Sequence, residues 1–225
     1  MSQFDPAPQS GEPLDDQRFI LYIEGPRDRS ILWAWSYRLL PSPARRLFRA
    51  SVILGGRRPA RAVEHFRGEC GAGAGARGLC VLDRDDDPGW QPPQPAEPGL
   101  DFFTWSRRHI ESYLLVPEAI RRALARWNDD ARIGRVLREH LPLAECEDAV
   151  RDVDAKRLLG PTGALARALG RPLPLSRIAR LTREGELHAD VHALFARLRD
   201  EIGPNRLRPR GADRAAVPLV RRPRS

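Results

Sequence analysis

Short, continuously apolar segments alternate with amphipathic ones through the first half of the chain. Residues 19–23 (FILYI) are too short for a helix and rich in β-branched and aromatic side chains, which is typical of a strand buried on both faces. The further strands that we predict from similar runs are residues 51–56, 78–83 and 100–105. Apolar side chains recur at helical spacing in the segments 28–40 and 59–67. Strands alternating with helices predict an α/β fold with a parallel sheet flanked by helices.

The second half of the chain has the apolar spacing of helices. The helices that we predict there are residues 117–127, 131–140, 146–159, 162–169, 174–182 and 187–202. Five prolines between Pro88 and Pro98 exclude a helix or an inner strand and predict a surface loop at 86–99. The organisation that we expect is a disordered leader at 1–16, an α/β core at 17–116, a helical C-terminal part at 117–202 and a basic disordered tail at 203–225.

Charge is distributed unevenly along the chain. There are 38 basic and 30 acidic side chains, and only one of the basic residues, Lys156, is not an arginine. Residues 203–225 contain seven arginines and one aspartate, so this tail carries most of the net charge of +8. It is either a solvated end or an arm that binds nucleic-acid phosphates without regard to sequence. The arginines that we expect in such an arm are Arg206, Arg208, Arg210, Arg221, Arg222 and Arg224.

The sequence favours a soluble protein of the cytoplasm. The three cysteines, Cys70, Cys80 and Cys146, have neither metal-ligand spacing nor an even number for a disulfide framework. The amino terminus is acidic and lacks the pattern of a signal peptide. The longest nearly uncharged stretch, residues 31–37, is too short to cross a bilayer. We therefore expect no membrane association.

One apparent nucleotide-binding motif is discarded. Residues 73–78 satisfy the pattern GxGxxG, but a dinucleotide-binding loop follows a strand and begins a helix. This stretch follows a predicted helix and leads into a predicted strand. A Gly/Ala linker is the better interpretation.

Acidic residues stand where two of the predicted strands end. Glu24 follows the first strand, and Asp83 and Asp85 end the third, where side-chain alternation would place both on one face. If these strands are neighbours, the three carboxylates converge at the carboxyl edge of the sheet, where ligands bind in α/β folds. Close carboxylates raise one another's pKa, and a hard cation such as Mg²⁺ or Mn²⁺ relieves that repulsion. For Asp86 and Asp87 alone, a solvated turn is the favoured interpretation.

These residues resemble the TOPRIM domain, the metal-binding module of topoisomerases, bacterial primases and overcoming-lysogenization-defect (OLD) nucleases. The matching segments are Ile23-Glu24-Gly25-Pro26-Arg27-Asp28, Val81-Leu82-Asp83-Arg84-Asp85, Leu54-Gly55-Gly56 and His109-Ile110-Glu111-Ser112-Tyr113-Leu114-Leu115. The last two are similar to segments of standalone bacterial TOPRIM proteins. The four segments together, spread over about residues 18–160, are fairly specific and imply a TOPRIM-like parallel sheet.

The resemblance implies phosphodiester hydrolysis of DNA or RNA with two bound Mg²⁺ or Mn²⁺ ions. Glu24 would be the central ligand or general base, and Asp83 and Asp85 would be metal ligands. Asp28 and Glu111 would serve the second ion. Glu111 has a competing interpretation as a helix cap or ion-pair residue. His109 can likewise be interpreted as only an exposed residue at a strand end.

Lys156 is conspicuous because every other basic residue is an arginine. A compact ammonium group serves where a planar guanidinium does not fit. The segment Asp154-Ala155-Lys156-Arg157-Leu158-Leu159 resembles the one with which OLD-type nucleases place a lysine near the metals, so our hypothesis is a catalytic role in stabilising the transition state. The alternative is an exposed lysine without function.

The chain lacks the GxxxxGK[ST] loop of an ATPase, so any control by ATP would require a separate ATPase partner. The resemblance to standalone TOPRIM effectors implies a setting in anti-phage defence. A different class, a non-catalytic module that binds nucleic acid or a partner, would keep the fold without needing the acidic residues. The sequence does not indicate an oligomeric state.

Overall fold

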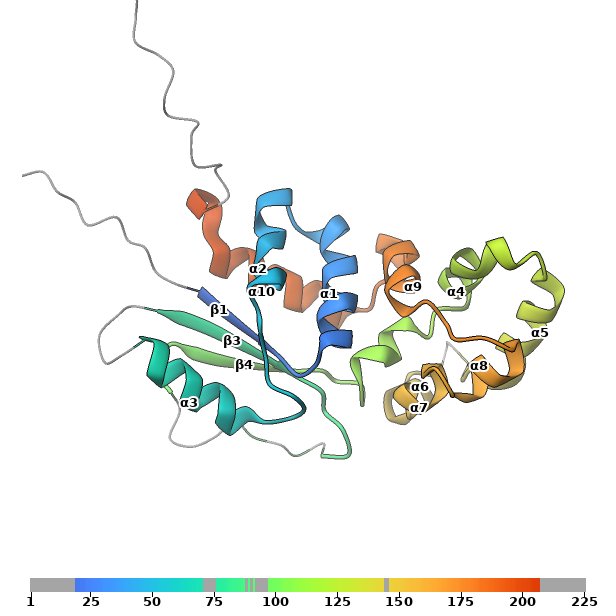
Figure 1. The fold of residues 1–225 in the computed structure, drawn as a ribbon, viewed down its shortest axis with the longest axis horizontal. Coiled ribbons are helices and arrows are strands. Elements are labelled where there is room, and N and C mark those ends of the chain that lie inside the picture. Colours follow the sequence, from blue (N-terminus) through green and yellow to red (C-terminus); the bar gives the residue numbers. More distant parts are fainter. Residues whose placement is uncertain are drawn as a thin grey trace, which may run out of the picture.

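A four-stranded parallel sheet forms the centre of the protein, seen in a computed structural model that describes residues 19–70, 76–87, 89, 91, 97–143 and 146–206. The strands are β1 (Phe19–Ile23), β2 (Val52–Ile53), β3 (Arg77–Leu82) and β4 (Leu100–Thr104). Their order in the sheet is β2-β1-β3-β4, and all three pairs are parallel (Figure 1). The predicted α/β class is confirmed, and so is the expectation that the first and third strands are neighbours.

Both faces of the sheet are buried, as the continuous apolar strands predict. Alternate residues of β1 and β3 belong to two separate hydrophobic clusters: Leu21 and Val81 lie in one, Tyr22 and Leu82 in the other. Consecutive side chains of a strand point to opposite faces, so a strand between two layers needs apolar residues at every position.

Helices form the two outer layers. On one face lie α1 (Pro26–Leu39), α2 (Arg46–Arg49) and the last helix, α10 (Ala189–Arg206), while α3 (Pro59–Cys70) covers the other (Figure 1). Phe48 of α2 packs against Phe195 of α10, with ring centroids 6.0 Å apart. The larger hydrophobic cluster extends from the sheet into the helices after residue 116. The two predicted parts of the chain therefore share one core.

The helix that follows β1 begins with a sequence suited to that position. Pro26 occupies the first turn, where its missing N–H costs no hydrogen bond. The backbone N–H of Gly25 donates to Oδ2 of Asp28 at 3.0 Å, which fixes the entry into the helix. At the other end Leu40 is extended and precedes Pro41, as residues before proline usually are. The sequence thus starts α1 directly at the carboxyl end of β1.

The 3-10 helix η1 (Ser42–Arg45) connects α1 to α2. The remaining helices form an extension beyond the sheet (Figure 1). They are η2 (Ile110–Leu114), α4 (Pro117–Leu124), η3 (Ala125–Trp127), α5 (Asp130–His140), α6 (Glu147–Asp152), α7 (Ala155–Leu159), α8 (Ala164–Leu169), α9 (Leu175–Leu181) and η4 (Glu184–Glu186), where η marks 3-10 helices. The single helix predicted at 146–159 is wrong, because the chain divides it into α6 and α7. Asp154 begins α7 by accepting a hydrogen bond from the N–H of Arg157 at 2.9 Å, as an N-cap residue does.

The last helix is one turn longer than predicted. We expect an end at Ile202, before Gly203 and Pro204, but α10 continues to Arg206. A proline removes one backbone donor, and helices do continue through such positions. The predicted leader and the other tail arginines, at 208, 210, 221, 222 and 224, lie outside the described residues.

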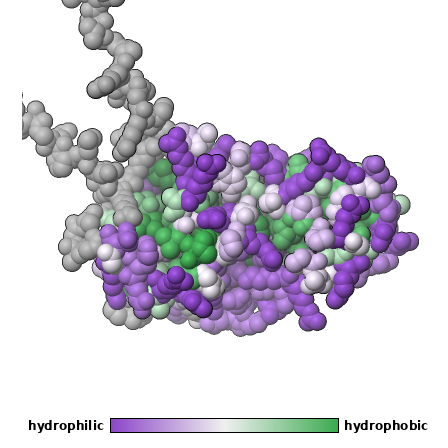
Figure 2. All heavy atoms as spheres, viewed as in Figure 1, coloured by the Kyte–Doolittle hydropathy of each residue, from purple (hydrophilic) through white to green (hydrophobic). Residues whose placement is uncertain are grey.

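The surface of the described part is polar where the helices face outward. Figure 2 shows hydrophilic residues over most of the visible face, with hydrophobic residues between the helices. Among the helices of the described residues, none is long and apolar enough to cross a membrane.

Candidate metal centre

The sheet brings the first two predicted site residues together at its carboxyl edge. Glu24 is the residue after β1, and Asp83 is the residue after the neighbouring β3. Oε1 of Glu24 accepts a hydrogen bond from the backbone N–H of Asp83 at 2.7 Å. Both residues are buried, with exposed fractions of 6% and 2%. The side chain of Glu24 is therefore held by the backbone at the end of β3.

Asp83 connects three segments of the chain. Its Oδ1 accepts a hydrogen bond from the N–H of Ile110 at 2.8 Å, which holds the start of η2 against β3. Its Oδ2 lies 2.6 Å from Nζ of Lys156 in α7. The lysine that stands alone in the sequence thus forms an ion pair at the carboxylate cluster.

Three further carboxylates complete the predicted set, and two of them share a pocket with Glu24. Asp28 of α1 and Glu111 of η2 line a pocket of about 190 Å³ together with Glu24 and Lys156. Oε1 of Glu111 lies 3.4 Å from a guanidinium nitrogen of Arg27. Its buried Oε2 has no hydrogen-bond partner among the described residues. Glu111 is therefore an ion-pair residue, as its competing interpretation holds, and also part of the carboxylate pocket.

Asp85 reaches the cluster in a different way from the one predicted. The side-chain alternation expected for Asp83 and Asp85 is wrong, because β3 ends at Leu82 and Asp85 has a left-handed backbone with φ of 51°. Asp residues tolerate this conformation in turns. The turn still leaves Oδ1 of Asp85 4.0 Å from Nζ of Lys156. Asp83 and Asp85 thus flank the same ammonium group.

The expectation that His109 is exposed is also wrong. Its exposed fraction is 5%, and its ring lies between two carboxylates. The imidazole Nε2 is 3.5 Å from Oδ1 of Asp85, and Nδ1 is 3.8 Å from Oδ1 of Asp154. Burial, reinforced by the charge of Lys156, lowers the pKa of His109. The neutral ring is therefore favoured at the site.

Crowding and burial change the acidity of the pocket carboxylates. Burial, followed by the charge of Asp83, raises the pKa of Glu24 to about 7. Burial and the charges of Asp83 and Glu111 raise the pKa of Asp28 to about 8. Burial and the charge of Asp83 also raise the pKa of Glu111. The carboxylates of the pocket thus outnumber the cations that could neutralise them, and this favours their protonated forms.

The same carboxylates raise the pKa of Lys156. Burial of its ammonium group lowers the pKa, but the charge of Asp83 and the hydrogen bond to it outweigh burial, so that the pKa is raised overall. Lys156 therefore stays charged and supplies one positive charge to a cluster of five carboxylates.

The chemical type of the predicted ligands suits a hard divalent cation, but their arrangement in the structure does not. All five predicted ligands are carboxylates, the class that Mg²⁺ and Mn²⁺ prefer, and one buried oxygen of Glu111 has no hydrogen-bond partner among the described residues. Within the described ranges, however, no three acidic, imidazole or thiol groups surround one point closely enough to hold a metal ion. The Lys156 ammonium lies against Asp83, where it neutralises charge that a cation would otherwise neutralise.

Three participants at the site have no counterpart in our sequence predictions: Arg27, His109 as a buried group, and Asp154. Arg27 lies between two predicted ligands in the sequence, and Asp154 lies two residues before Lys156. Proximity in the sequence to predicted site residues was the signal that could have identified Arg27 and Asp154. Their contacts depend on how η2 and α7 pack onto the edge of the sheet.

No family model, curated protein or solved structure matches this chain.

Proposed function

We propose that this protein is a metal-dependent nuclease of the TOPRIM type, which hydrolyses phosphodiester bonds of DNA or RNA. The observation that supports it best is the convergence of Glu24, Asp28, Glu111 and Lys156 on one pocket at the carboxyl edge of a parallel sheet. Asp83 and Asp85 adjoin it through Lys156. Four separate segments of the chain contribute these residues. Three of them belong to the TOPRIM resemblance, and the fourth, around Lys156, is the segment that resembles OLD-type nucleases.

Each residue has a role that its position supports. Glu24, Asp83 and Asp85, with Asp28 and Glu111, would hold Mg²⁺ or Mn²⁺, which lower the pKa of a bound water and offset charge on phosphate oxygens. In its alternative role as a general base, Glu24 would not bind a metal, and its pKa of about 7 would suit proton transfer near neutral pH. Lys156 would place its charge beside the phosphate, and the partly exposed Arg27 would contact a neighbouring phosphate oxygen.

A cleavage assay tests this proposal. The full chain is incubated with labelled single- and double-stranded DNA and RNA in the presence of Mg²⁺, Mn²⁺ or EDTA. We expect cleavage with either metal, none with EDTA, and none by Glu24→Ala. Glu118→Gln is a matched control because Glu118 is an exposed acid of α4, and it should cleave at the wild-type rate. Cleavage that persists in EDTA or in Glu24→Ala would contradict the proposal.

A non-catalytic binding module is the second candidate. The contact between Lys156 and Asp83 at 2.6 Å favours it, because an ion pair of this kind can stabilise the cluster without any metal. Loss of all cleavage, together with unchanged stability when Mg²⁺ is added, would favour this candidate over the nuclease.

We also propose a setting, which rests on the TOPRIM resemblance: a cytoplasmic effector in anti-phage defence that a separate ATPase controls. The prediction is that a neighbouring reading frame encodes an ATPase and that the two proteins copurify. An ATPase partner should change the rate of cleavage when ATP is added. Nuclease activity that is complete in the isolated chain and unaffected by any neighbouring ATPase would contradict this setting.

A further inference from the structure

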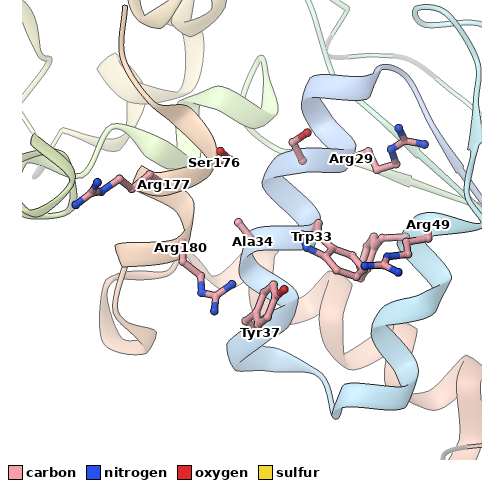
Figure 3. Close-up of a pocket in the computed structure, with 10 residues that line it drawn as sticks. Arg29, Trp33, Ala34, Tyr37, Arg49, Ser176, Arg177 and Arg180 are labelled. Atoms are coloured by element: carbon pink, nitrogen blue, oxygen red, sulfur yellow. The ribbon is translucent and has the colours of Figure 1, made fainter.

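A second, larger pocket lies on the opposite side of α1 from the carboxylates. Its volume is about 630 Å³, and α1, α2 and α9 line it (Figure 3). This volume is within the range of sites for small ligands. The residues that characterise it are four arginines and two aromatic residues: Arg29, Arg49, Arg177, Arg180, Trp33 and Tyr37. No acidic residue lines it.

Within the described part of the chain, none of the four guanidinium groups of this arginine–aromatic pocket forms an ion pair with a carboxylate. The hydrogen bond with Arg180, followed by that with Trp33 and the charges of Arg180 and Arg45, lowers the pKa of Tyr37. Arg49 and Arg180 lie beside the two rings of the pocket, and positive charges without an acidic partner among the described residues favour an anionic ligand.

Two aromatic rings lie among these charges. Trp33 and Tyr37 are four residues apart on α1, so they share a helix face, and their ring centroids are 5.8 Å apart. The guanidinium carbon of Arg180 lies 3.3 Å from the centroid of the Tyr37 ring, and that of Arg49 lies 5.1 Å from the Trp33 ring. Figure 3 shows Arg180 reaching from α9 toward Tyr37 and Arg49 lying beside Trp33. Flat rings with adjacent cations can hold a base and its phosphates together.

The pocket is connected to the carboxylates. A smaller pocket of about 280 Å³ shares Ser30 and Ser176 with the arginine–aromatic pocket. The same smaller pocket shares Arg27 with the carboxylate pocket. Trp33 lies five residues after Asp28 on α1, which is about 8 Å along the helix axis. The three pockets therefore adjoin one another through shared lining residues around the first half of α1.

We propose that the arginine–aromatic pocket binds an unpaired nucleotide of a single-stranded nucleic acid whose neighbouring phosphodiester lies at the carboxylate pocket. Guanidinium groups of Arg180 and Arg45 already cover the Tyr37 ring, so Trp33 is the ring on which a base would lie. A base must be unstacked from its neighbours before it can do so, and duplex bases are not free. The inference rests on the proposed nuclease function in naming the substrate, and it adds that the substrate is single-stranded at this position.

Equilibrium binding in EDTA tests the pocket without requiring cleavage. Fluorescence anisotropy is measured with a labelled single strand of about twelve nucleotides, within the usual size of such sites, and with the matching duplex. The double variant Arg49→Gln/Arg180→Gln is compared with Arg135→Gln/Arg138→Gln. The control pair lies exposed on α5, at the far end of the molecule from the sheet (Figure 1), and removes the same charge. We expect the pocket variant to bind the single strand at least about tenfold more weakly, and the control to stay within about threefold.

The aromatic contribution is tested separately, with folding checked by circular dichroism. Trp33→Leu should weaken single-strand binding about fivefold or more, whereas Trp33→Phe, which keeps a stacking surface, should stay within about threefold of wild type. Equal binding by folded wild type, Trp33→Leu and the double arginine variant would overturn the inference. Duplex binding as tight as single-strand binding would overturn it too.

Two further outcomes separate this inference from the nuclease proposal. Competition by AMP as effective as by the oligonucleotide would overturn the inference in favour of a free-nucleotide site. Metal-dependent cleavage with normal binding by the pocket variants would refute the inference and leave the nuclease proposal standing. Single-strand binding that depends on the pocket, with no cleavage under any condition, would support the inference and refute the nuclease proposal.

Discussion

Two pockets of opposite charge adjoin the same helix. The carboxylate pocket contains Asp28 of α1, and the arginine–aromatic pocket contains its sequence neighbour, Arg29. The first gathers buried acids with raised pKa values, and the second is lined by arginines that form no ion pair with a carboxylate among the described residues. Lys156 and Arg27 compensate the acidic charge only in part. The contrast teaches that the two pockets favour ligands of opposite sign, and the nucleic acid and divalent cations that we propose would satisfy both.

The largest effect should come from removing a predicted ligand while its shape is kept. Asp83→Asn retains an oxygen that can accept from Ile110 but removes the charge that faces Lys156. We expect the rate of metal-dependent cleavage to fall on the order of 10³-fold. Asp86→Asn is the control, because Asp86 is exposed and pairs only with Arg108 among the described residues, and it should stay within about twofold. An equal loss of cleavage rate in Asp83→Asn and Asp86→Asn would show that the buried carboxylates have no role in cleavage that the exposed Asp86 lacks.

A smaller effect should follow from changing the shape of the cationic side chain at position 156 while its charge is kept. Lys156→Arg keeps a positive charge beside Asp83, but a planar guanidinium cannot replace the compact ammonium in the same space. Cleavage should slow by about ten- to a hundredfold, with an unchanged unfolding midpoint. Initial rates at saturating Mg²⁺ measure this. An unchanged rate in a folded variant would contradict the catalytic hypothesis for Lys156.

The excess negative charge should make the metal-free protein sensitive to pH. The folded-state pKa values of Glu24 and Asp28, about 7 and about 8, lie above their unfolded values, so the folded state holds these protons more tightly. The stability that they contribute is complete below about pH 4 and is lost as the pH rises through 7 and 8. Relative to Glu24→Gln, the wild type should lose about 2 kcal/mol or more between pH 5 and pH 9.

Urea unfolding in EDTA at several pH values measures this difference. Addition of Mg²⁺ should restore part of the lost stability at pH 8, because a cation binds only the charged carboxylates. A difference between wild type and Glu24→Gln that stays constant with pH would contradict the burial of an unneutralised carboxylate at this position.

The smallest effect concerns the positive pocket. Because Arg49 is exposed and has no acidic partner within the described residues, Arg49→Gln should change the free energy of unfolding by less than about 1 kcal/mol. Thermal unfolding in EDTA measures it. A larger destabilisation would mean that Arg49 stabilises the fold, and weakened nucleic-acid binding by its variants could then no longer be assigned to a lost ligand contact.

The sequence predicts the sheet well because its signals are local. Residues 19–23 are apolar at every position, and this pattern requires a strand between two layers. The positions of Glu24 and Asp83 follow from that register alone. The placement of Asp85 does not, since strand periodicity ends at Leu82 and a left-handed turn takes over. The burial of His109 and the break between α6 and α7 depend on tertiary packing, which no local pattern contains.

The arginine–aromatic pocket shows the same limit. Trp33 and Tyr37 lie on one face of a predicted helix, where aromatic residues usually indicate core. Arg177 and Arg180 belong to a helix more than 130 residues later in the chain. Only the packing of α9 beside α1 brings these groups together. A search for charge alone would have selected the tail instead.

Metal binding tests the central claim most directly, because it does not depend on finding the substrate or a regulatory partner. Isothermal titration of the full chain with Mn²⁺ at pH 8 should show saturable binding that Glu24→Gln weakens at least about tenfold and that Glu118→Gln leaves unchanged. Absence of saturable binding, or equal binding by wild type and Glu24→Gln, would contradict the account.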